Sequence, residues 1–434
     1  MSVQALSSSF LGVIGRTEGV HLNALLDRGF HVVQCRTANL ARLFSYVRDW
    51  SGRESWNFGL YGAASETDPA MAEIKALAEA AERYSAAVVA DDEFIVASAN
   101  ALGDRCFRWQ DLPRLSEAEL KAPGQMLHNF DPDAPIRWVR ALELQSREPI
   151  LIPMVTTHLY PRAWTSERFW NPISTGVAVH PDKLRAAVGG ILEVIERDAL
   201  ALNWLTQRPL RRIRFSERDL EALAPATAQL LQVGDTALYE GTTDLGLPVV
   251  YARRYRPRHP SVVNVVACAA DFTVLRAVEK AVSEMVMIGA ALEMTVHQPP
   301  AEIAEFQSLL DGAVYMMAAP RAAAFGFLDQ GGDVGFAQLA ERDSEAPQDS
   351  NASFLALTAS LRQANKRAYL SELTTDELKD CELYSVRAVI PGLMPMSFIH
   401  RSRYLASTRL REFQSWLGEP AGNTPLNPFP QPFA

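Results

Sequence analysis

The sequence of 434 residues has no excess of positive charge and no long hydrophobic run. Its formal net charge is −9, whereas a protein that binds nucleic acid usually presents a basic face to the phosphates. No apolar run reaches the roughly 18 residues that a membrane-spanning helix needs, and the first residues lack the basic start and cleavage pattern of a secretory signal. We therefore expect a cytoplasmic protein that binds neither nucleic acid nor membrane.

Cysteine is scarce, and the familiar catalytic motifs are missing. The four cysteines, Cys35, Cys106, Cys268 and Cys381, are far apart and show no C-x-x-C spacing. This argues against a zinc site or a disulfide framework and favours buried small side chains. The chain also has no P-loop, no G-x-G-x-x-G after a strand, no H-E-x-x-H and no G-x-S-x-G, and its eight histidines are scattered. The missing motifs therefore argue against a kinase, a Rossmann enzyme, a zinc protease or a hydrolase of the familiar types.

Hydrophobic residues make up 48% of the chain, which is enough for a sizeable core. Period and β-branched content predict strands within 246–256, 261–272 and 383–398. Three long helices are expected: one from Asp68 to about Ala87, one that ends in ILEVIERDALALNWL, and one across 273–294. Asp68 followed by Pro69 is a typical helix start, because the carboxylate can accept from a free N–H and proline loses no hydrogen bond there.

Strands that alternate with long helices indicate an α+β fold, with layered sheets and several long helices. No internal repeat of solenoid period is present. We expect residues 1–60 to be an N-terminal extension and residues 61–434 to form one domain that ends in a proline-rich tail, 425–434.

Two of the expected helices share an E-x-x-E-R signature, which is formed by Glu79, Glu82 and Arg83 and again by Glu193, Glu196 and Arg197. A helix brings positions i, i+3 and i+4 to one face. A single copy could be a solvated stripe with an ion pair worth about 0.2–0.5 kcal/mol. Four carboxylates brought together would repel one another unless a cation joined them, and oxygen ligands suit Mg²⁺. Two arginines beside them could bind phosphate in a bidentate way, so the residues favour a Mg²⁺-dependent nucleotide site without a P-loop.

The sequence blocks around these residues resemble the YcaO family. They are A-x-x-E-A-x-E-R-Y-S at 76–85, S-T-G-V-A at 174–178, L-E-V-I-E-R-D-A at 192–199, K-A-V-S-E at 280–284 and V-R-A-V-I-P-G-L at 386–393. The resemblance covers roughly residues 60–295, and the last block extends it. It implies a fold particular to that family, ATP and Mg²⁺ as cofactors, and activation of a peptide backbone amide.

The resemblance also implies roles for individual residues. It makes Glu79, Glu82, Glu193 and Glu196 the Mg²⁺ and phosphate cluster. It gives the ATP site to Ser65, Glu79, Arg83, Glu193, Arg197, Lys280 and Glu284. The sequence departs from the family pattern where Lys280 replaces arginine, around Ala64-Ser65-Glu66, which replaces Gly-Lys-Gly, and at Lys75, Ala178, Arg185, Gly189 and Met287. The metal cluster is therefore retained better than the nucleoside contacts.

The C-terminal tail carries P-x-P-x-P at Pro428, Pro430 and Pro432. By itself a proline-rich tail is often an extended spacer. By resemblance, this ending is typical of the azoline-forming branch and makes the tail, including Ala434, the candidate catalytic region. Phe433 and Ala434 lie beyond the motif, which departs from an ending in the last proline.

The reaction that the resemblance implies is cyclodehydration of Cys, Ser or Thr residues in a ribosomally made precursor peptide. The side chain adds to the preceding carbonyl, the resulting oxygen is phosphorylated by ATP, and loss of phosphate leaves a thiazoline or oxazoline. The implied partners are a leader-binding subunit and an FMN-dependent azoline dehydrogenase, in an oligomeric complex of the microcin-synthetase type. Two alternatives stay open: a thioamide- or amidine-forming relative, and a non-catalytic peptide-binding scaffold.

Overall fold

The protein is described by a computed structural model that covers residues 3–8, 12–21, 27, 29–47, 61–90, 93–159, 162–419 and 425–433. Its strands form three sheets in the described part of the chain. The smallest sheet is antiparallel, in the order β1 (Ile14–Val20), β2 (His31–Thr37) and β3 (Tyr61–Glu66). Strands from the expected N-terminal extension, residues 1–60, therefore share a sheet with the first strand of the expected domain.

The second sheet has five strands in the order β11-β10-β9-β8-β12, and only β12 runs parallel to its neighbour. The bounds of its strands are β8 (Arg211–Arg214), β9 (Thr236–Glu240), β10 (Val249–Tyr255), β11 (Asn264–Ala270) and β12 (Asp333–Gly335). The expected strands within 246–256 and 261–272 are β10 and β11, which confirms both. β11 is an edge strand of this sheet.

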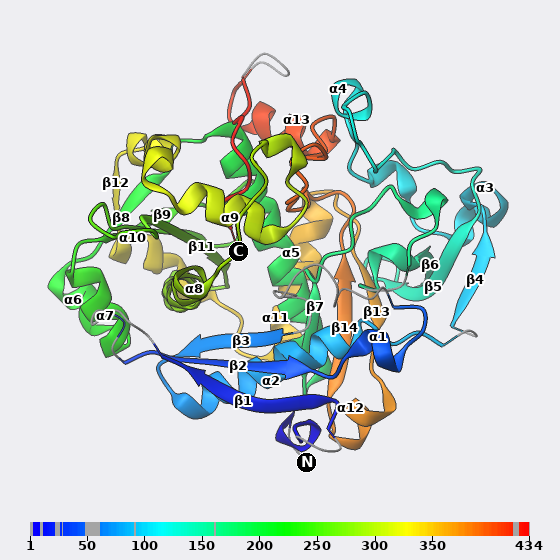
Figure 1. The fold of residues 1–434 in the computed structure, drawn as a ribbon, viewed down its shortest axis with the longest axis horizontal. Helices are drawn as coiled ribbons and strands as arrows, with labels where there is room; N and C mark the ends of the chain where they lie inside the picture. The colour runs from blue at the N-terminus through cyan, green and yellow to red at the C-terminus, as the bar shows by residue number, and fades with distance from the viewer. Residues whose placement is uncertain are drawn as a thin grey trace.

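The third sheet is antiparallel, in the order β4-β5-β13-β14-β7, and β6 also pairs with β5. Its strands are β4 (Phe94–Ala97), β5 (Ile136–Glu143), β6 (Pro149–Pro153), β7 (Val177–His180), β13 (Tyr369–Glu372) and β14 (Tyr384–Val389). β14 confirms the strand expected within 383–398. Figure 1 shows this sheet on the right and the five-stranded sheet on the left.

The three expected long helices are present as α2 (Pro69–Ser85), α5 (Lys183–Thr206) and α8 (Val274–Met294). Asp68 accepts from the N–H of Ala70 over 2.8 Å, and Pro69 occupies the first turn, as the sequence predicted. The α8 N-terminus is held by the carboxylate of Asp343, which accepts from the N–H of Val274 over 2.8 Å. The remaining helices are shorter: α1 (Leu40–Leu43), α3 (Ala99–Leu102), α4 (Glu117–Leu120), α6 (Glu217–Glu221), α7 (Pro225–Gln232), α9 (Leu309–Met317), α10 (Phe336–Ala340), α11 (Ser350–Gln363), α12 (Asp376–Asp380) and α13 (Thr408–Trp416).

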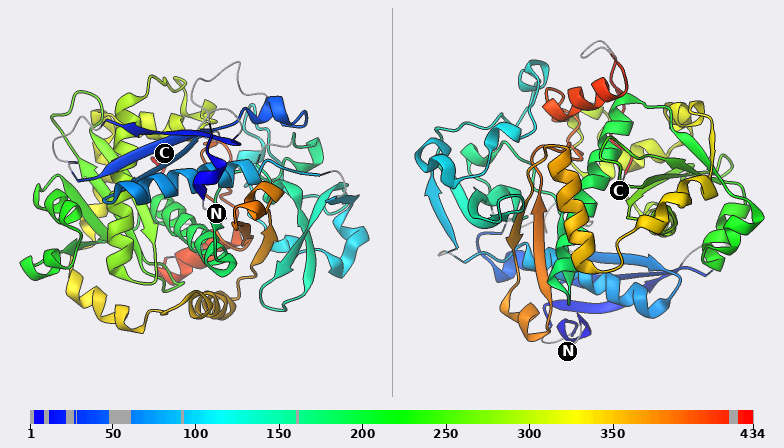
Figure 2. Two further views of the ribbon diagram at one scale, coloured as in Figure 1. Left: turned by 90° about the horizontal axis from the view of Figure 1, so that it is seen from below. Right: turned by 180° about the vertical axis from the view of Figure 1, so that it is seen from behind.

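Helix α5 lies between the two larger sheets, where it packs on β7 and β14 on one side and on β11 on the other (Figure 1). Figure 2 shows α11 beside α5 at the back of the molecule. Alternate residues of β11 face opposite layers, because side chains in a strand alternate. Cys268 packs with the α5 residue Leu200, whereas Ala267 and Ala269 pack in the cluster that contains the α8 residue Ala277.

Two glycines allow neighbouring elements to approach each other closely. A Cβ on Gly62 of β3 would lie 2.1 Å from the carbonyl oxygen of Ala76 in α2. Gly176, just before β7, has a φ of +90°, and a Cβ there would lie 2.3 Å from the carbonyl oxygen of Ala388 in β14. These contacts fix α2 against β3, and the turn before β7 against β14, with no space for a larger side chain.

Candidate active site

Glu79 and Glu82 extend from α2 toward different sheets. The N–H of Ala63, on β3, donates to Glu79 Oε2 over 2.8 Å, and Arg83 Nη2 donates to Glu79 Oε1 over 2.7 Å. The N–H of Val179, on β7, donates to Glu82 Oε1 over 3.1 Å. The first E-x-x-E-R signature therefore connects α2 to the three-stranded sheet and to the six-stranded sheet.

Glu193 and Glu196 extend from α5 in the same manner. The N–H of Gly176 donates to Glu193 Oε2 over 2.9 Å, and the N–H of Ala270, the last residue of β11, donates to Glu196 Oε2 over 2.9 Å. Arg197 Nη1 lies 3.1 Å from Glu196 Oε1, and its Nη2 lies 3.7 Å from Glu193 Oε1. Glu196 has no exposed surface, so its charge depends on these partners.

Helix α8 adds a lysine and a carboxylate to this cluster. Lys280 Nζ donates to Glu196 Oε2 over 3.0 Å and lies 3.9 Å from Glu284 Oε1. Burial and the charge of Glu196 raise the pKa of Glu284 to about 7, against the opposing charges of Lys280 and Arg197. Burial alone would lower the pKa of Lys280, but Glu196 and Glu284 raise it above its ordinary value, so Lys280 stays charged. The α8 residues expected at the ATP site therefore meet the α5 signature at the edge of β11.

The two E-x-x-E-R signatures also interact with each other. Burial raises the pKa of Glu82 well above its ordinary value, and the negative charges of Glu79 and Glu193 raise it further. Arg83 and the N–H of Val179 oppose this rise. Because Glu82 and Glu193 come from different helices, their repulsion indicates that the fold brings the carboxylates of α2 and α5 near one another.

A divalent cation fits the chemistry of this region. In the residues that the structure describes, no three ligating groups already converge on one point as a metal site would require. Burial, and then the charges of Glu79 and Glu193, nevertheless disfavour the ionised form of Glu82, and a bound cation would favour that form. Mg²⁺ is commonly held by one or two carboxylates while it keeps several waters and phosphate oxygens. Glu79, Glu82 and Glu193 therefore offer suitable donors.

Ser65 lies on β3, two residues beyond the Ala63 N–H that binds Glu79. Its side chain is buried, and its Oγ has no hydrogen-bond partner in the described part of the chain. Its carbonyl oxygen accepts from Ser283 Oγ of α8, next to Glu284 in sequence. A buried hydroxyl without a partner is costly, which is consistent with the ligand contact expected for Ser65.

Sequence reasoning did not assign two arginines that the structure places at the carboxylate-bearing helices. Arg387, on β14, is buried, and the charges of Glu193 and Arg83 both affect its pKa. Arg409, on α13, donates to both oxygens of Asp198, the residue that follows Arg197 in α5. A charged residue inside the apolar V-R-A-V-I-P-G-L block was the available signal for Arg387. For Arg409 no sequence signal was available.

The C-terminal tail enters the molecule, so it is not a free spacer. Pro428 is exposed, whereas Pro430 and Pro432 are buried. The ring of Phe433 packs edge-on against Tyr251, with 5.3 Å between ring centroids. Tyr251 is the strand partner of Cys268, which is close enough to Glu196 to be affected by its charge. Ala434 lies outside the described residues.

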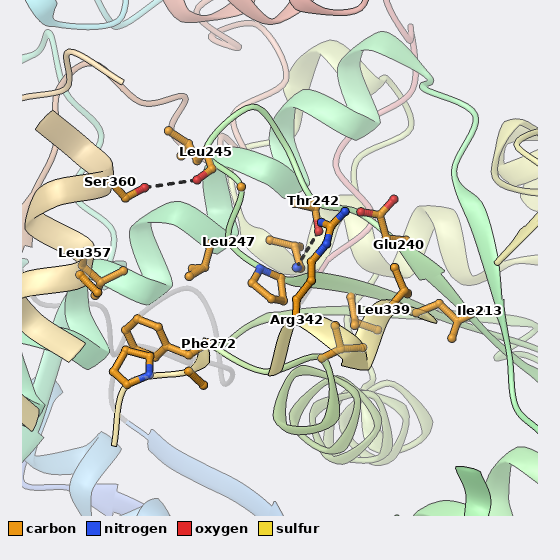
Figure 3. Close-up of a pocket in the computed structure, with 18 residues that line it drawn as sticks. Ile213, Glu240, Thr242, Leu245, Leu247, Phe272, Leu339, Arg342, Leu357 and Ser360 are labelled. Carbon is orange, nitrogen blue, oxygen red and sulfur yellow. Dashed lines mark hydrogen bonds between the residues drawn. The ribbon is translucent and has the colours of Figure 1, made fainter. Parts of the chain in front are cut away.

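A cavity of about 330 Å³ lies away from the E-x-x-E-R helices' charged residues, and none of the predicted site residues lines it. Figure 3 shows it between the loop 241–248, Phe272, Arg342 and α11. Its walls are mainly apolar, with Glu240, Thr242 and Arg342 at one end in Figure 3. The size of this cavity would suit a ligand. The charged residues of the two E-x-x-E-R signatures, however, lie at the junction of α2, α5 and α8, so we place the candidate site there. None of the described helices is both long and apolar enough to cross a membrane.

Comparison with known proteins gives one family and several similar folds. The family model described as YcaO cyclodehydratase, ATP- and Mg²⁺-binding, matches residues 64–394. A heterocyclase in complex with substrate and cofactor aligns with a TM-score of 0.78 at 20% identity, over 99% of this chain and 56% of its own length. This chain therefore spans little more than half of that protein. None of the curated proteins matches the chain.

Two further solved structures have a similar fold. YcaO from Methanopyrus kandleri, bound with AMPPCP and Mg²⁺, aligns with a TM-score of 0.61 at 16% identity, over 89% of this chain and 87% of its own. The E. coli microcin synthetase McbBCD complex with pro-MccB17 bound contains a chain that aligns with a TM-score of 0.61 at 14% identity, over 95% of this chain and 96% of its own. These likenesses support the α+β fold with layered sheets that the sequence predicted.

Proposed function

Because this chain belongs to the YcaO family of ATP- and Mg²⁺-binding cyclodehydratases, we propose that it converts Cys, Ser or Thr residues of a ribosomally made precursor peptide to azolines. The observation that carries the proposal is the meeting of the two E-x-x-E-R helices, where Glu82 lies close enough to Glu79 and Glu193 to be affected by their charges. A magnesium nucleotide supplies both the cation and the phosphates that such a site requires.

Each group of residues has a distinct part in this proposal. Glu79, Glu82 and Glu193 would hold Mg²⁺, and Arg83 would bind phosphate oxygens beside them. Glu196 is engaged by Arg197 and Lys280 and would position these cations for the nucleotide. Bound Mg·ATP would supply the phosphoryl group that makes the oxygen of the cyclised amide a good leaving group.

The tail is proposed as the element that approaches the peptide. Asn427 anchors it to the end of α5, because its N–H donates to the carbonyl of Leu205 over 2.8 Å and its side chain donates to the carbonyl of Trp204 over 3.1 Å. Beyond this anchor, Pro430 and Pro432 direct the chain toward Tyr251. Anchoring at Asn427 and burial at Phe433 would hold the tail between these residues in one position near the cluster.

We further propose that the protein acts within a complex. The E. coli neighbour is part of a synthetase complex with its peptide bound, and a chain in it matches this chain over nearly the whole length of both. From the resemblance to the azoline-forming branch of the family we expect a leader-binding partner subunit and an FMN-dependent azoline dehydrogenase. The alternatives to azoline formation are thioamide or amidine formation and a peptide-binding scaffold, which the test below distinguishes.

The test is mass spectrometry of a candidate precursor peptide that has been incubated with this chain, its partner subunit, Mg²⁺ and ATP. Azoline formation predicts the ATP-dependent loss of one water for each ring, which fragmentation locates at a Cys, Ser or Thr residue. The same loss located at an amine would instead identify an amidine-forming enzyme. A sulfur-for-oxygen exchange would instead identify a thioamide-forming enzyme. Peptide binding with no change of mass, unaltered by Glu82→Gln, would indicate a scaffold and contradict the proposal.

A further inference from the structure

Arg387 is a buried cation without an ion pair in the described part of the chain. It lies on β14 opposite Val177 of β7, and only 3% of its surface is exposed. Its Nη1 donates to the carbonyl of Ile173 over 2.8 Å, whereas its Nε has no hydrogen-bond partner. One neutral carbonyl does not compensate a buried guanidinium, so an anion is missing from this environment.

The electrostatic surroundings of Arg387 agree with this geometry. Burial lowers its pKa to about 10, the charge of Glu193 partly opposes this effect, and the charge of Arg83 adds to it. Arg387 therefore remains protonated at neutral pH. No carboxylate lies within 4.0 Å of its nitrogens among the described residues, so Glu193 influences it from a distance without forming an ion pair.

A small cavity of about 30 Å³ adjoins Arg387. Arg197, Thr175 and Trp170 also line it, and none of its lining residues is acidic. The indole N–H of Trp170 is buried and has no hydrogen-bond partner either. The polar groups around the cavity are therefore mainly donors, and a volume near that of one or two waters admits only the end of a ligand. An oxygen that accepts hydrogen bonds and carries negative charge fits such a space.

We propose that this cavity binds the terminal phosphoryl group of ATP and that Arg387 is a donor to its oxygens. The inference rests on the proposed function, which places Mg²⁺ at Glu193 and its neighbours. Arg197, which also lines this cavity, has its Nη2 3.7 Å from Glu193 Oε1, so the cavity adjoins the carboxylates that would hold Mg²⁺. A triphosphate held there would bring its terminal phosphoryl group toward Arg387. A nucleoside is too large for the cavity, so only the terminal phosphoryl group can enter it.

The test is calorimetric titration of the full chain with Mg·ATP, Mg·ADP and AMP, for the wild type, Arg387→Gln and Arg387→Lys. We expect Arg387→Gln to weaken the binding of Mg·ATP at least about tenfold and the binding of Mg·ADP by less than about threefold. The reason is that a lost charged hydrogen bond affects only the phosphate that it contacts. Arg387→Lys keeps the charge but loses the planar fork of the guanidinium, so its affinity for Mg·ATP should lie between those of the wild type and Arg387→Gln. Arg253→Gln is the matched control, because Arg253 is also buried with an unpartnered Nε.

The possible results separate this inference from the proposed function. Equal weakening of Mg·ATP and Mg·ADP would mean that Arg387 only supports the Ile173 loop, and unchanged Mg·ATP binding would also overturn the inference. In both cases the wild type still binds Mg·ATP and the proposed function stands. A wild type that binds no Mg·ATP would overturn both. If Arg387→Gln does not fold, Arg387→Lys carries the same comparison between ATP and ADP.

Discussion

The two E-x-x-E-R helices share one spacing but differ in how their charges are neutralised. On α2, Arg83 is paired with Glu79, and the oxygens of Glu82 receive the Val179 N–H without a cation in ion-pair contact in the described part of the chain. On α5, Glu196 is contacted by two cations, Arg197 at 3.1 Å and Lys280 at 3.0 Å.

This difference separates two roles that the sequence presents as equal. The α5 signature is neutralised within the protein, so Glu196 mainly fixes Arg197 and Lys280 at the edge of β11. In the described part of the chain, no cation is in ion-pair contact with Glu82 of the α2 signature, and the nearby charge of Glu193 disfavours its ionised form further. We therefore place the Mg²⁺ ion of the proposed site closer to Glu82 and Glu193 than to Glu196.

The largest expected effect is on the stability of the protein without ligand. Glu196→Ala leaves Arg197, Lys280 and the N–H of Ala270 without their carboxylate, and we expect a loss of about 3–5 kcal/mol in the free energy of unfolding. Glu79 is 31% exposed in its side chain, so Glu79→Ala should cost only about 1 kcal/mol. Urea denaturation of both variants measures the difference. Equal losses would contradict the unequal burial of the two signatures.

A second expected effect is a dependence of stability on pH. The pKa of Glu284 is about 7 in the folded protein, above its ordinary value of 4.5. The folded state therefore binds more protons than the unfolded state between these values, and stability should fall as pH rises through this window, by about 1–3 kcal/mol. Glu284→Gln should reduce the slope measured by urea denaturation from pH 4.5 to 7.5, and the raised pKa of Glu82 should leave a remaining slope of the same sign. An unchanged slope in that variant would assign the dependence elsewhere.

The smallest expected effect is that of replacing Lys280 by arginine. Lys280→Arg keeps the charge beside Glu196 and adds the planar fork that the family pattern has at this position, so stability without ligand should change by less than about 1 kcal/mol. We expect Mg·ATP to bind at least as well as in the wild type, which titration calorimetry measures. Weaker binding would show that the lysine at this position serves a purpose that arginine cannot replace.

Local sequence signals predicted the helices that carry the site. Asp68 and Pro69 marked the start of α2. The apolar runs further along the chain predicted both ends of α8, and the end of α5, to within one residue. The spacing placed Glu79 with Glu82, and Glu193 with Glu196, on common faces. Resemblance, not spacing, indicated that Lys280 and Glu284 would join them. Of the residues predicted for the ATP and Mg²⁺ site, all except Ser65 lie within long periodic segments, where sequence patterns are most informative.

Burial and partners across the sheets could not be predicted in this way. Glu82 and Glu196 occupy the same position of the signature, but Glu196 is fully buried and Glu82 only partly buried. The N–H of Ala270 on β11 and Lys280 on α8, which contact Glu196, follow it by many residues. Arg387 is a single charge within a strand and has no spacing to identify its role. Asp198 follows the E-x-x-E-R block directly, but one further residue along the helix turns it toward Arg409. These outcomes depend on contacts between distant segments.

The most direct test of the account is thermal unfolding with and without Mg·ATP, for the wild type, Glu82→Gln, Glu193→Gln and the exposed control Glu117→Gln. Glutamine keeps the size of the side chain and an acceptor for the Val179 or Gly176 N–H. At 100 times the dissociation constant, Mg·ATP should stabilise the wild type and Glu117→Gln by about 2.7 kcal/mol, and ATP without Mg²⁺ should not. The account predicts that Glu82→Gln and Glu193→Gln lose most of this stabilisation. Full stabilisation of both variants would contradict a Mg²⁺ site between α2 and α5.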